Sequence, residues 1–431
     1  MHSRAAALRQ KIGFWLGKFA YGVADQSAAS GGNFLLNILL VRFFLPEQYG
    51  AFTIAFSVFL FLSGFHNAFI LEPLSVIGPL YYSERLAEYL KVTIHLHFLL
   101  TLGMSALCFV IFLVCRLFFN WGQFLFSGLF SVSFAMPFIL FFWLTRRVCY
   151  LEQKAHVALV GSGVYLFFVI CGLFFLRYWN ILGLFNIFLL LALTSILGSG
   201  IIWLRLGLSF RDIFKAPAGL LNTVTIQHWN YGKWTAGLTL PSWICLDFYF
   251  ILIASILGLA QTAVFRALQN LFMPLNQLLG VIGLFMVPWF SHQRSKQGNS
   301  YVRSKIFPLT AIYALFAVCY VSLILIYKDS LLKLLYNNSY YSRFAGLLPY
   351  LALAAVVSAL WQPLSNILRV MEKPKVIFFT KTVAMAYVLI FGVASVYFWG
   401  FYGAITSIIV STLIELMIFG FYLKKKLAQP I

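Results

Sequence analysis

The chain has 431 residues, of which 62% are hydrophobic and only 10% are charged. A soluble domain carries about 25% charged residues and about half apolar ones. The composition therefore indicates a polytopic membrane protein, and it excludes a soluble enzyme, a nucleic-acid-binding protein and a secreted disulfide scaffold. The net charge of +20 has to be interpreted by position, because lysine and arginine gather on the cytoplasmic side of membrane proteins.

The hydrophobic residues fall into twelve runs of the length that a spanning helix needs, about 20 residues. Little sequence lies outside these runs, so there is no room for a separate catalytic domain. Polar residues interrupt the first and the eighth run. The predicted spans are 18–42, 50–71, 93–115, 123–145, 156–176, 181–204, 234–257, 260–289, 307–327, 346–368, 376–398 and 402–423.

Most lysines and arginines lie in every second loop, on the side that also holds the N-terminus. This alternation predicts that both termini are cytoplasmic. The longest loop on the same side, 205–233, separates six spans from six. We therefore expect an N-terminal bundle over 1–204, a cytoplasmic linker over 205–233 and a C-terminal bundle over 234–431.

The two halves of the chain resemble each other weakly. PEQYGAFTIAF at 46–56 is similar to GLAQTAVFRAL at 258–268, at the same place in each half. Two halves that begin on the same side of the membrane are related by an axis along the membrane normal. The sequence thus predicts an all-α polytopic membrane protein of about twelve transmembrane helices, in two pseudo-two-fold related six-helix bundles around a central cavity.

Polar residues inside the first span lie on one helical face. The face contains Gln26, Asn33 and Asn37 together with Ser30, at steps of three and four residues. Such a face can form the wall of a polar cavity. It can also hold helices together, since amides and small residues pack helices in membranes.

The eighth span carries the sharpest polar signal. An arginine inside a span needs water, an acid or an anion, because its guanidinium is always charged. Pro274 breaks the helix in the middle of this polar stripe. The stripe either binds substrate or, through Arg266, pairs with Asp247 of the neighbouring span. Its candidate substrate-binding residues are Arg266, Gln269, Asn270, Asn276 and Gln277.

The tenth and eleventh spans add three more candidates for the cavity. Gln362 and Asn366 lie beside Pro363 in the tenth span, and Lys381 lies near the inner end of the eleventh. A lysine at that depth can also reach the interface with its long side chain.

Three acids lie inside spans: Asp25, Asp247 and Glu415. Ionisable residues at such depth mark ion pathways or pair with one another. Each acid is a candidate to bind a coupling proton or Na⁺, or to neutralise Arg266 or Lys381. No catalytic motif, metal-ligand pattern or nucleotide-binding loop accompanies them, so we expect no enzyme activity, no cofactor, no metal and no ATPase.

The stretch LLVRFFLPEQYGAF, within 31–61, resembles the opening of bacterial polysaccharide biosynthesis membrane proteins. These are oligosaccharide flippases of the Wzx type, in the superfamily that also contains multidrug and toxin extrusion transporters. The resemblance rests on the short turn LPEQYG at 45–50 and on the twelve-span topology. It implies a multi-pass protein of the bacterial inner membrane with a cationic cavity, to which Arg42, Arg146, Arg266 and Lys381 could contribute.

The resemblance also implies a substrate and partners. The substrate would be a polyprenyl-diphosphate-linked oligosaccharide, flipped to the outer leaflet by alternating access for surface polysaccharide biosynthesis. Membrane lipids, a polysaccharide polymerase and the export machinery would be the partners. One alternative is a small-molecule or drug antiporter of the same superfamily. Another is a membrane glycosyltransferase, polymerase or ligase, although the longest outer loop, 327–343, holds a single acid, Asp329.

Overall fold

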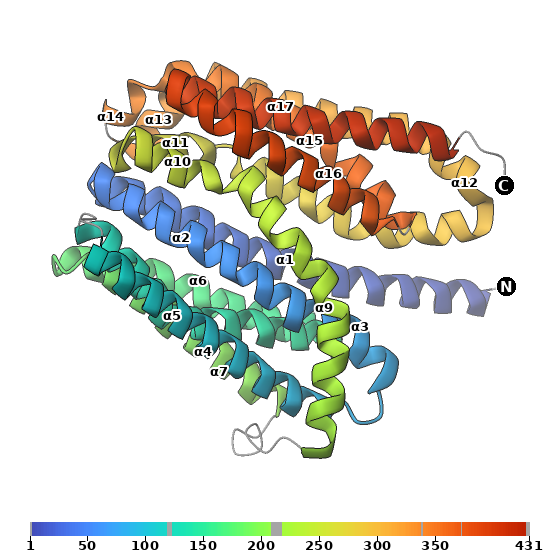
Figure 1. The fold of residues 1–431 in the computed structure, drawn as a ribbon. Helices are drawn as coiled ribbons and strands as arrows, with labels where there is room; N and C mark the ends of the chain where they lie inside the picture. The colour runs from blue at the N-terminus through green and yellow to red at the C-terminus, as the bar shows by residue number, and fades with distance from the viewer. Residues whose placement is uncertain (1, 119–122, 208–217, 338, 372, 428–431) are drawn as a thin grey trace. The chain divides into compact units, whose positions relative to one another are not determined.

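The computed structural model describes residues 2–118, 123–207, 218–337, 339–371 and 373–427 (Figure 1). These residues form helices and no strands. The chain divides into two compact units. Unit 1 comprises Met1–Leu36 and Val58–Ala236, and unit 2 comprises Asn37–Ser57 and Gly237–Ile431. The turn between the first two helices thus belongs to the unit that contains the C-terminal half of the chain.

The helices follow the hydrophobic runs of the sequence. From the N-terminus to the break between the halves they are α1 (His2–Phe43), α2 (Pro46–His66), the π-helix η1 (Asn67–Leu71), α3 (Glu72–Tyr81), α4 (Leu86–Phe118), α5 (Gln123–Leu151), α6 (Ala155–Tyr178), α7 (Leu184–Leu206) and α9 (Ala218–Leu246).

The second half continues the same all-helical pattern with several short elements at the helix ends. These helices are α10 (Phe248–Ile256), α11 (Leu259–Asn270), α12 (Met273–Ile326), α13 (Lys328–Tyr336), α14 (Ser339–Ser342), the 3₁₀ helix η2 (Ala345–Leu347), α15 (Leu348–Val370), α16 (Pro374–Tyr387), the π-helix η3 (Val388–Gly392) and α17 (Val393–Leu427).

Eight described helices are long and apolar enough to cross a membrane, or nine if α9 and α10, bent by 42°, form one span. One of the eight, Lys375–Lys425, holds two predicted spans. It turns back at Gly400, whose φ of 54° is in the left-handed region. The first and eighth predicted spans are not among the eight. Polar residues interrupt the first, and the eighth is divided between α11, which has only 12 residues, and α12. The all-α polytopic class is confirmed.

The predicted linker 205–233 is largely helical. Residues 208–217 lie outside the described residues, but 218–233 form the first half of α9. Val224, His228 and Gly232 recur every four residues, which places them on one face of the helix, and all three are buried in unit 1. The abundant polar residues of this segment lie on the other faces, which is why the sequence alone suggested a loop.

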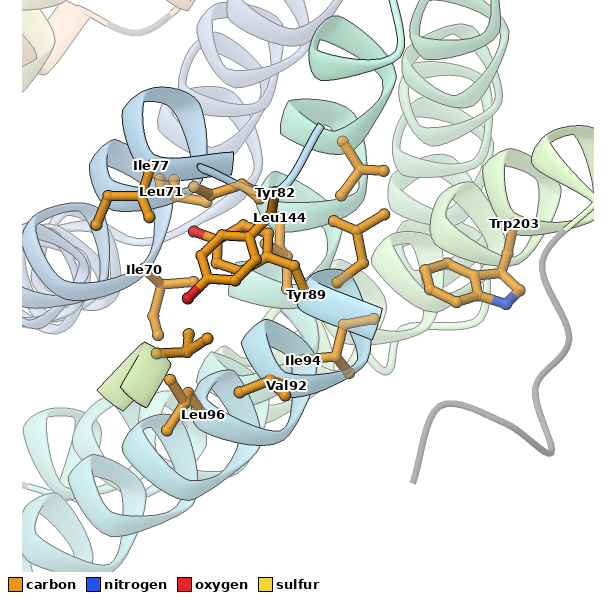
Figure 2. Close-up of a cluster of buried hydrophobic side chains, with 14 residues drawn as sticks. Ile70, Leu71, Ile77, Tyr82, Tyr89, Val92, Ile94, Leu96, Leu144 and Trp203 are labelled. Atoms are coloured by element: carbon orange, nitrogen blue, oxygen red, sulfur yellow. The ribbon is translucent and has the colours of Figure 1, made fainter. Parts of the chain in front are cut away.

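A hydrophobic cluster at one end of unit 1 fixes the start of α9 (Figure 2). The rings of Tyr82 and Tyr89 stack at its centre, 4.7 Å apart. The hydroxyl of Tyr89 lies 2.8 Å from Nε2 of His228, and Nδ1 of the same histidine lies 2.8 Å from the carbonyl oxygen of Phe69. Both ring nitrogens of this buried histidine are therefore satisfied, as burial of a polar group requires.

The turn LPEQYG attaches the 37–57 hairpin to the rest of unit 2. Pro46 is the first residue of α2, where its missing N–H costs nothing. Tyr49 is fully buried. Its hydroxyl donates to Oδ1 of Asn37 at 2.9 Å and accepts from Nδ2 of Asn270 at 2.9 Å. Pro46 and Tyr49 thus both have a structural role in this turn.

Gly50 allows this hairpin to approach α11 closely. A Cβ atom at this position would lie 2.0 Å from the carbonyl oxygen of Leu259, the first residue of α11. The obstacle is backbone, so it cannot move aside as a side chain would. Only glycine fits between α2 and α11.

Gly50→Ala should therefore lower the free energy of unfolding by about 1–3 kcal/mol through overpacking. Thermal unfolding of the purified protein in detergent would measure the loss. Gly103→Ala in α4 is the matched control, since a Cβ there meets nothing within 4 Å. Equal stability of Gly50→Ala and Gly103→Ala would contradict the close approach.

Candidate functional site

The carboxylate of Asp25 lies at the centre of a polar cluster in unit 1. It is completely buried, and three side chains donate hydrogen bonds to it. Arg146 donates from Nη2 to Oδ2 at 2.7 Å and from Nε to Oδ1 at 3.3 Å. Ser162 donates to Oδ1 at 2.5 Å, and the hydroxyl of Tyr150 donates to Oδ2. The carboxylate is therefore paired, oriented and stripped of water.

Three helices supply this cluster. Asp25 is on α1, Ser162 is on α6, and Arg146 and Tyr150 are one turn apart on α5. Residues four apart share a helical face, so α5 presents both donors to the same carboxylate. The predicted alternative partners of Asp25, Arg266 and Lys381, both belong to unit 2.

Gln26 extends the cluster along α1. Its Oε1 lies 3.5 Å from Nη2 of Arg146, and its Nε2 donates to Ser30 at 3.1 Å. Asn33, one turn further, is half-buried. Gln26 is thus part of the Asp25 cluster, while Asn37 belongs to unit 2 and bonds Tyr49.

Arg266 and Asp247 lie near each other in unit 2. The charge of Arg266 acts on the carboxylate of Asp247 and on the hydroxyl of Tyr49, but no ion pair within 4.0 Å joins these two described residues. The guanidinium of Arg266 instead lies 5.2 Å from the centre of the Phe250 ring. Arg266 is therefore stabilised by an aromatic face and by an acid at longer range.

Asp247 occupies the break between α9 and α10. It is the N-cap residue of α10, where a negative charge is favourable because the free N–H groups of a helix N-terminus point toward it. Its backbone carbonyl accepts a hydrogen bond from Ser57 at 3.2 Å. Broken spans with exposed helix ends are typical of ion and substrate sites in transporters.

A buried hydrogen-bond network lies beside Arg266. Asn270 is fully buried and binds Tyr49, while its Oδ1 has no partner among the described atoms. Tyr336 donates to the carbonyl oxygen of Ala267 at 2.6 Å. Burial raises the pKa of Tyr336, so this hydroxyl remains a neutral donor. The network fixes α11 against the ends of α2 and α13.

The remaining amides of the predicted stripes differ in their burial. Gln269 and Gln362 are half-buried, whereas Asn276 and Gln277 are exposed. Asn366 is half-buried and lies next to the Tyr313 hydroxyl.

Lys381 and Glu415 form a second buried ion pair. The ammonium of Lys381 donates to Oε1 of Glu415 at 2.8 Å, and both side chains are less than a tenth exposed. The same ammonium lies 4.4 Å from the centre of the Trp361 ring. The sequence analysis gave this pairing as one alternative for Lys381. The other alternative, in which the lysine side chain extends to the membrane interface, does not hold.

The sequence missed several partners of these charges. Tyr150, Ser162 and Trp361 carry no signal of their own, since aromatic and hydroxyl residues are common in spans. Their roles follow only from helix packing. A four-residue spacing from Arg146 could have suggested Tyr150. Among the described residues, no group of three histidines, cysteines or acids is close enough to bind a metal ion.

Comparison with known proteins matches no family model and no curated protein. Solved structures do match. An inward-facing MATE family multidrug resistance transporter of the MOP superfamily has a TM-score of 0.78 at 12% identity, covering 94% of each chain. The outward-facing form of such a transporter has a TM-score of 0.67 at 13% identity, covering 95% of this chain and 94% of that one.

A further match is a MOP superfamily transporter from Pyrococcus furiosus, whose binding pocket has reversed polarity. Its TM-score is 0.67 at 12% identity, covering 96% of this chain and 95% of that one. The chain therefore has the fold of MATE transporters in the MOP superfamily, and the structures that share this fold are transporters rather than enzymes.

These matches correct the expected function. The matched structures include MATE family multidrug transporters, so the expectation of a lipid-linked oligosaccharide flippase is wrong and the antiporter alternative is favoured. The physical reason lies in the turn LPEQYG. Tyr49 and Gly50 attach a hairpin to α11. The motif therefore reflects how helices pack and does not indicate which substrate is transported.

The buried pair in unit 2 leads to a test of stability. Glu415→Gln should lower the free energy of unfolding by about 3–5 kcal/mol, because it leaves the Lys381 ammonium buried without a counter-charge. The double variant Lys381→Met, Glu415→Gln should recover much of this loss, since no charge is left unpaired. Thermal unfolding in detergent compares the two. A double variant no more stable than Glu415→Gln would show that the pairing is not what matters.

Proposed function

We propose that this protein is a secondary antiporter that exports small organic molecules, and that Asp25 binds the coupling ion. Three kinds of support bear on the proposal. The fold is that of multidrug transporters, for which inward-facing and outward-facing forms are known. The sequence contains no nucleotide-binding loop that could supply energy. Finally, Asp25 is a wholly buried carboxylate inside a membrane-embedded unit.

The buried Asp25 carboxylate is the observation that carries the proposal. A charge at the bilayer centre costs at least about 2.5–3.5 kcal/mol, and a charge inside a span, such as Asp25 in the predicted span 18–42, persists where function needs it or where a partner compensates it. Arg146, Tyr150 and Ser162 compensate the charge in the present state. Any coupling ion must therefore compete with these donors for the carboxylate oxygens.

Protonation of Asp25 changes the balance of charge in the cluster. Neutral Asp25 no longer neutralises Arg146, whose side chain is only 13% exposed. Because a guanidinium keeps its charge, Arg146 must then find water or an anion, or move. The proton thus changes which arrangement of α1 and α5 is lowest in free energy. Such a change in relative stability is what couples a proton to a conformational transition.

The test is transport by the purified protein in lipid vesicles. Ethidium is the probe, and a pH gradient, a Na⁺ gradient or no gradient is imposed. Wild-type protein should accumulate ethidium when one of the two gradients is present. Asp25→Asn, which keeps the shape and removes the charge, should reduce gradient-driven accumulation at least about tenfold, which corresponds to 1.4 kcal/mol of coupling.

Asp329→Asn is the matched control, because Asp329 is an exposed acid on α13, outside the predicted spans. It should transport as the wild type does. Ethidium exchange without a gradient should survive in Asp25→Asn, since this measures passage and not coupling. Full gradient-driven accumulation in Asp25→Asn would overturn the role of Asp25. Asp247→Asn would then test the next candidate for binding the coupling ion.

A further inference from the structure

Two matching stripes of side chains lie opposite each other where α4 ends and α5 begins. On α4 the stripe consists of Phe109, Phe112, Leu113 and Arg116, and on α5 of Gln123, Phe126, Ser127 and Phe130. Both follow the steps of three, one and three residues that place side chains on a single helical face. Helices α4 and α5 pack against each other in unit 1 (Figure 1), so the two faces meet.

Together the stripes line a cavity of about 690 Å³, within the range of small-molecule sites. Four phenyl rings, those of Phe109, Phe112, Phe126 and Phe130, line it. The ring of Phe112 lies 5.5 Å from that of Phe126 and 5.8 Å from that of Phe130, while Phe109 lies 6.0 Å from Phe130. Phe109 and Phe130 are each 38% exposed, so the cavity opens to the surface of the helix pair.

The polar residues of both stripes are at the same end. Arg116 ends the α4 stripe and Gln123 begins the α5 stripe, with Ser127 one turn further. The guanidinium of Arg116 lies 5.9 Å from the centre of the Phe126 ring. Arg116 follows the apolar span Leu86–Val114, which places it at the level of the lipid headgroups. The cavity is thus apolar along the span and cationic at the interface.

We propose that this cavity binds one anionic phospholipid. Its acyl chain would lie among the phenyl rings, and its phosphate would accept hydrogen bonds from Arg116 with Gln123 and Ser127 as further donors. The layout is that of a lipid, with charge at one end and hydrocarbon at the other, and a guanidinium suits a phosphate because it offers several donors in one plane. The proposal does not depend on what the protein transports.

The location of Arg116 strengthens this assignment. By the predicted orientation Arg116 lies on the outer side, which holds few lysines and arginines. The tendency of lysine and arginine to lie in cytoplasmic loops does not explain a basic residue on the outer side, so Arg116 needs another explanation. Arg116 has no acidic partner within 4.0 Å among the described residues, which leaves its charge available to an anion.

The experiment measures lipid binding by the purified full chain in detergent. Phosphatidylglycerol and phosphatidylcholine are titrated separately, and native mass spectrometry counts the bound lipids. Wild-type protein should bind the first phosphatidylglycerol about fivefold more tightly than phosphatidylcholine, the factor that one interfacial arginine contributes. Arg116→Ala should abolish the preference by weakening phosphatidylglycerol more than phosphatidylcholine, because the choline ammonium of the latter already offsets the charge of its phosphate. Arg116 is exposed, so its replacement should not impair folding.

Two controls make the result specific. Arg177→Ala removes the arginine in the last turn of α6, another helix end on the predicted outer side, and should keep the preference. Phe109→Ala should weaken both lipids equally, whereas Phe175→Ala, at an exposed phenyl ring on α6, should weaken neither. Inorganic phosphate should not compete.

The proposal fails on any of three results. An unchanged preference in Arg116→Ala would rule out the phosphate contact. An equal loss in Arg177→Ala would show that surface charge in general attracts the lipid. Displacement of phosphatidylglycerol by inorganic phosphate would show an anion site without a place for the acyl chain. None of these results bears on Asp25 or on transport.

Discussion

The cost of an unpaired charge in hydrocarbon constrains this structure throughout. Asp25 and Glu415 are both buried between helices. Each has a cationic partner within its own unit, Arg146 for Asp25 and Lys381 for Glu415. The first pair joins α1 to α5, which are far apart in sequence, and the second joins α16 to α17, which are separated only by the π-helix η3. The same constraint fixes the buried amides, since Asn37 and Asn270 share the hydroxyl of Tyr49 between them.

The turn LPEQYG shows how a sequence motif can indicate a fold correctly and a substrate wrongly. Its tyrosine joins two buried amides, and its glycine permits the backbone contact with Leu259. These demands arise from packing a hairpin against α11, and they are the same whatever the protein carries. A resemblance that rests on such a turn therefore supports the superfamily fold, while the choice between oligosaccharide and small molecule has to come from elsewhere.

Hydropathy predicted the class of the fold and most spans, because about 20 apolar residues have few other uses. It failed where a helix rich in polar residues buries only one face, as in the start of α9, whose face of Val224, His228 and Gly232 packs into unit 1. Their charge inside predicted spans also identified Asp25 and Lys381 as residues needing partners. It could not name Arg146 or Trp361, because a helical face does not specify which helix packs against it.

The two buried ion pairs differ in one chemical respect that separates their roles. Lys381 can pass a proton to Glu415, which leaves two neutral groups in contact and requires no movement. Arg146 cannot do so for Asp25, because a guanidinium in a protein keeps its proton. A proton arriving at Asp25 therefore always leaves a cation without its counter-charge, and the helices have to rearrange or admit an anion. The arginine makes the pair in unit 1 responsive to an ion, whereas the lysine allows the pair in unit 2 to remain in place as a static contact.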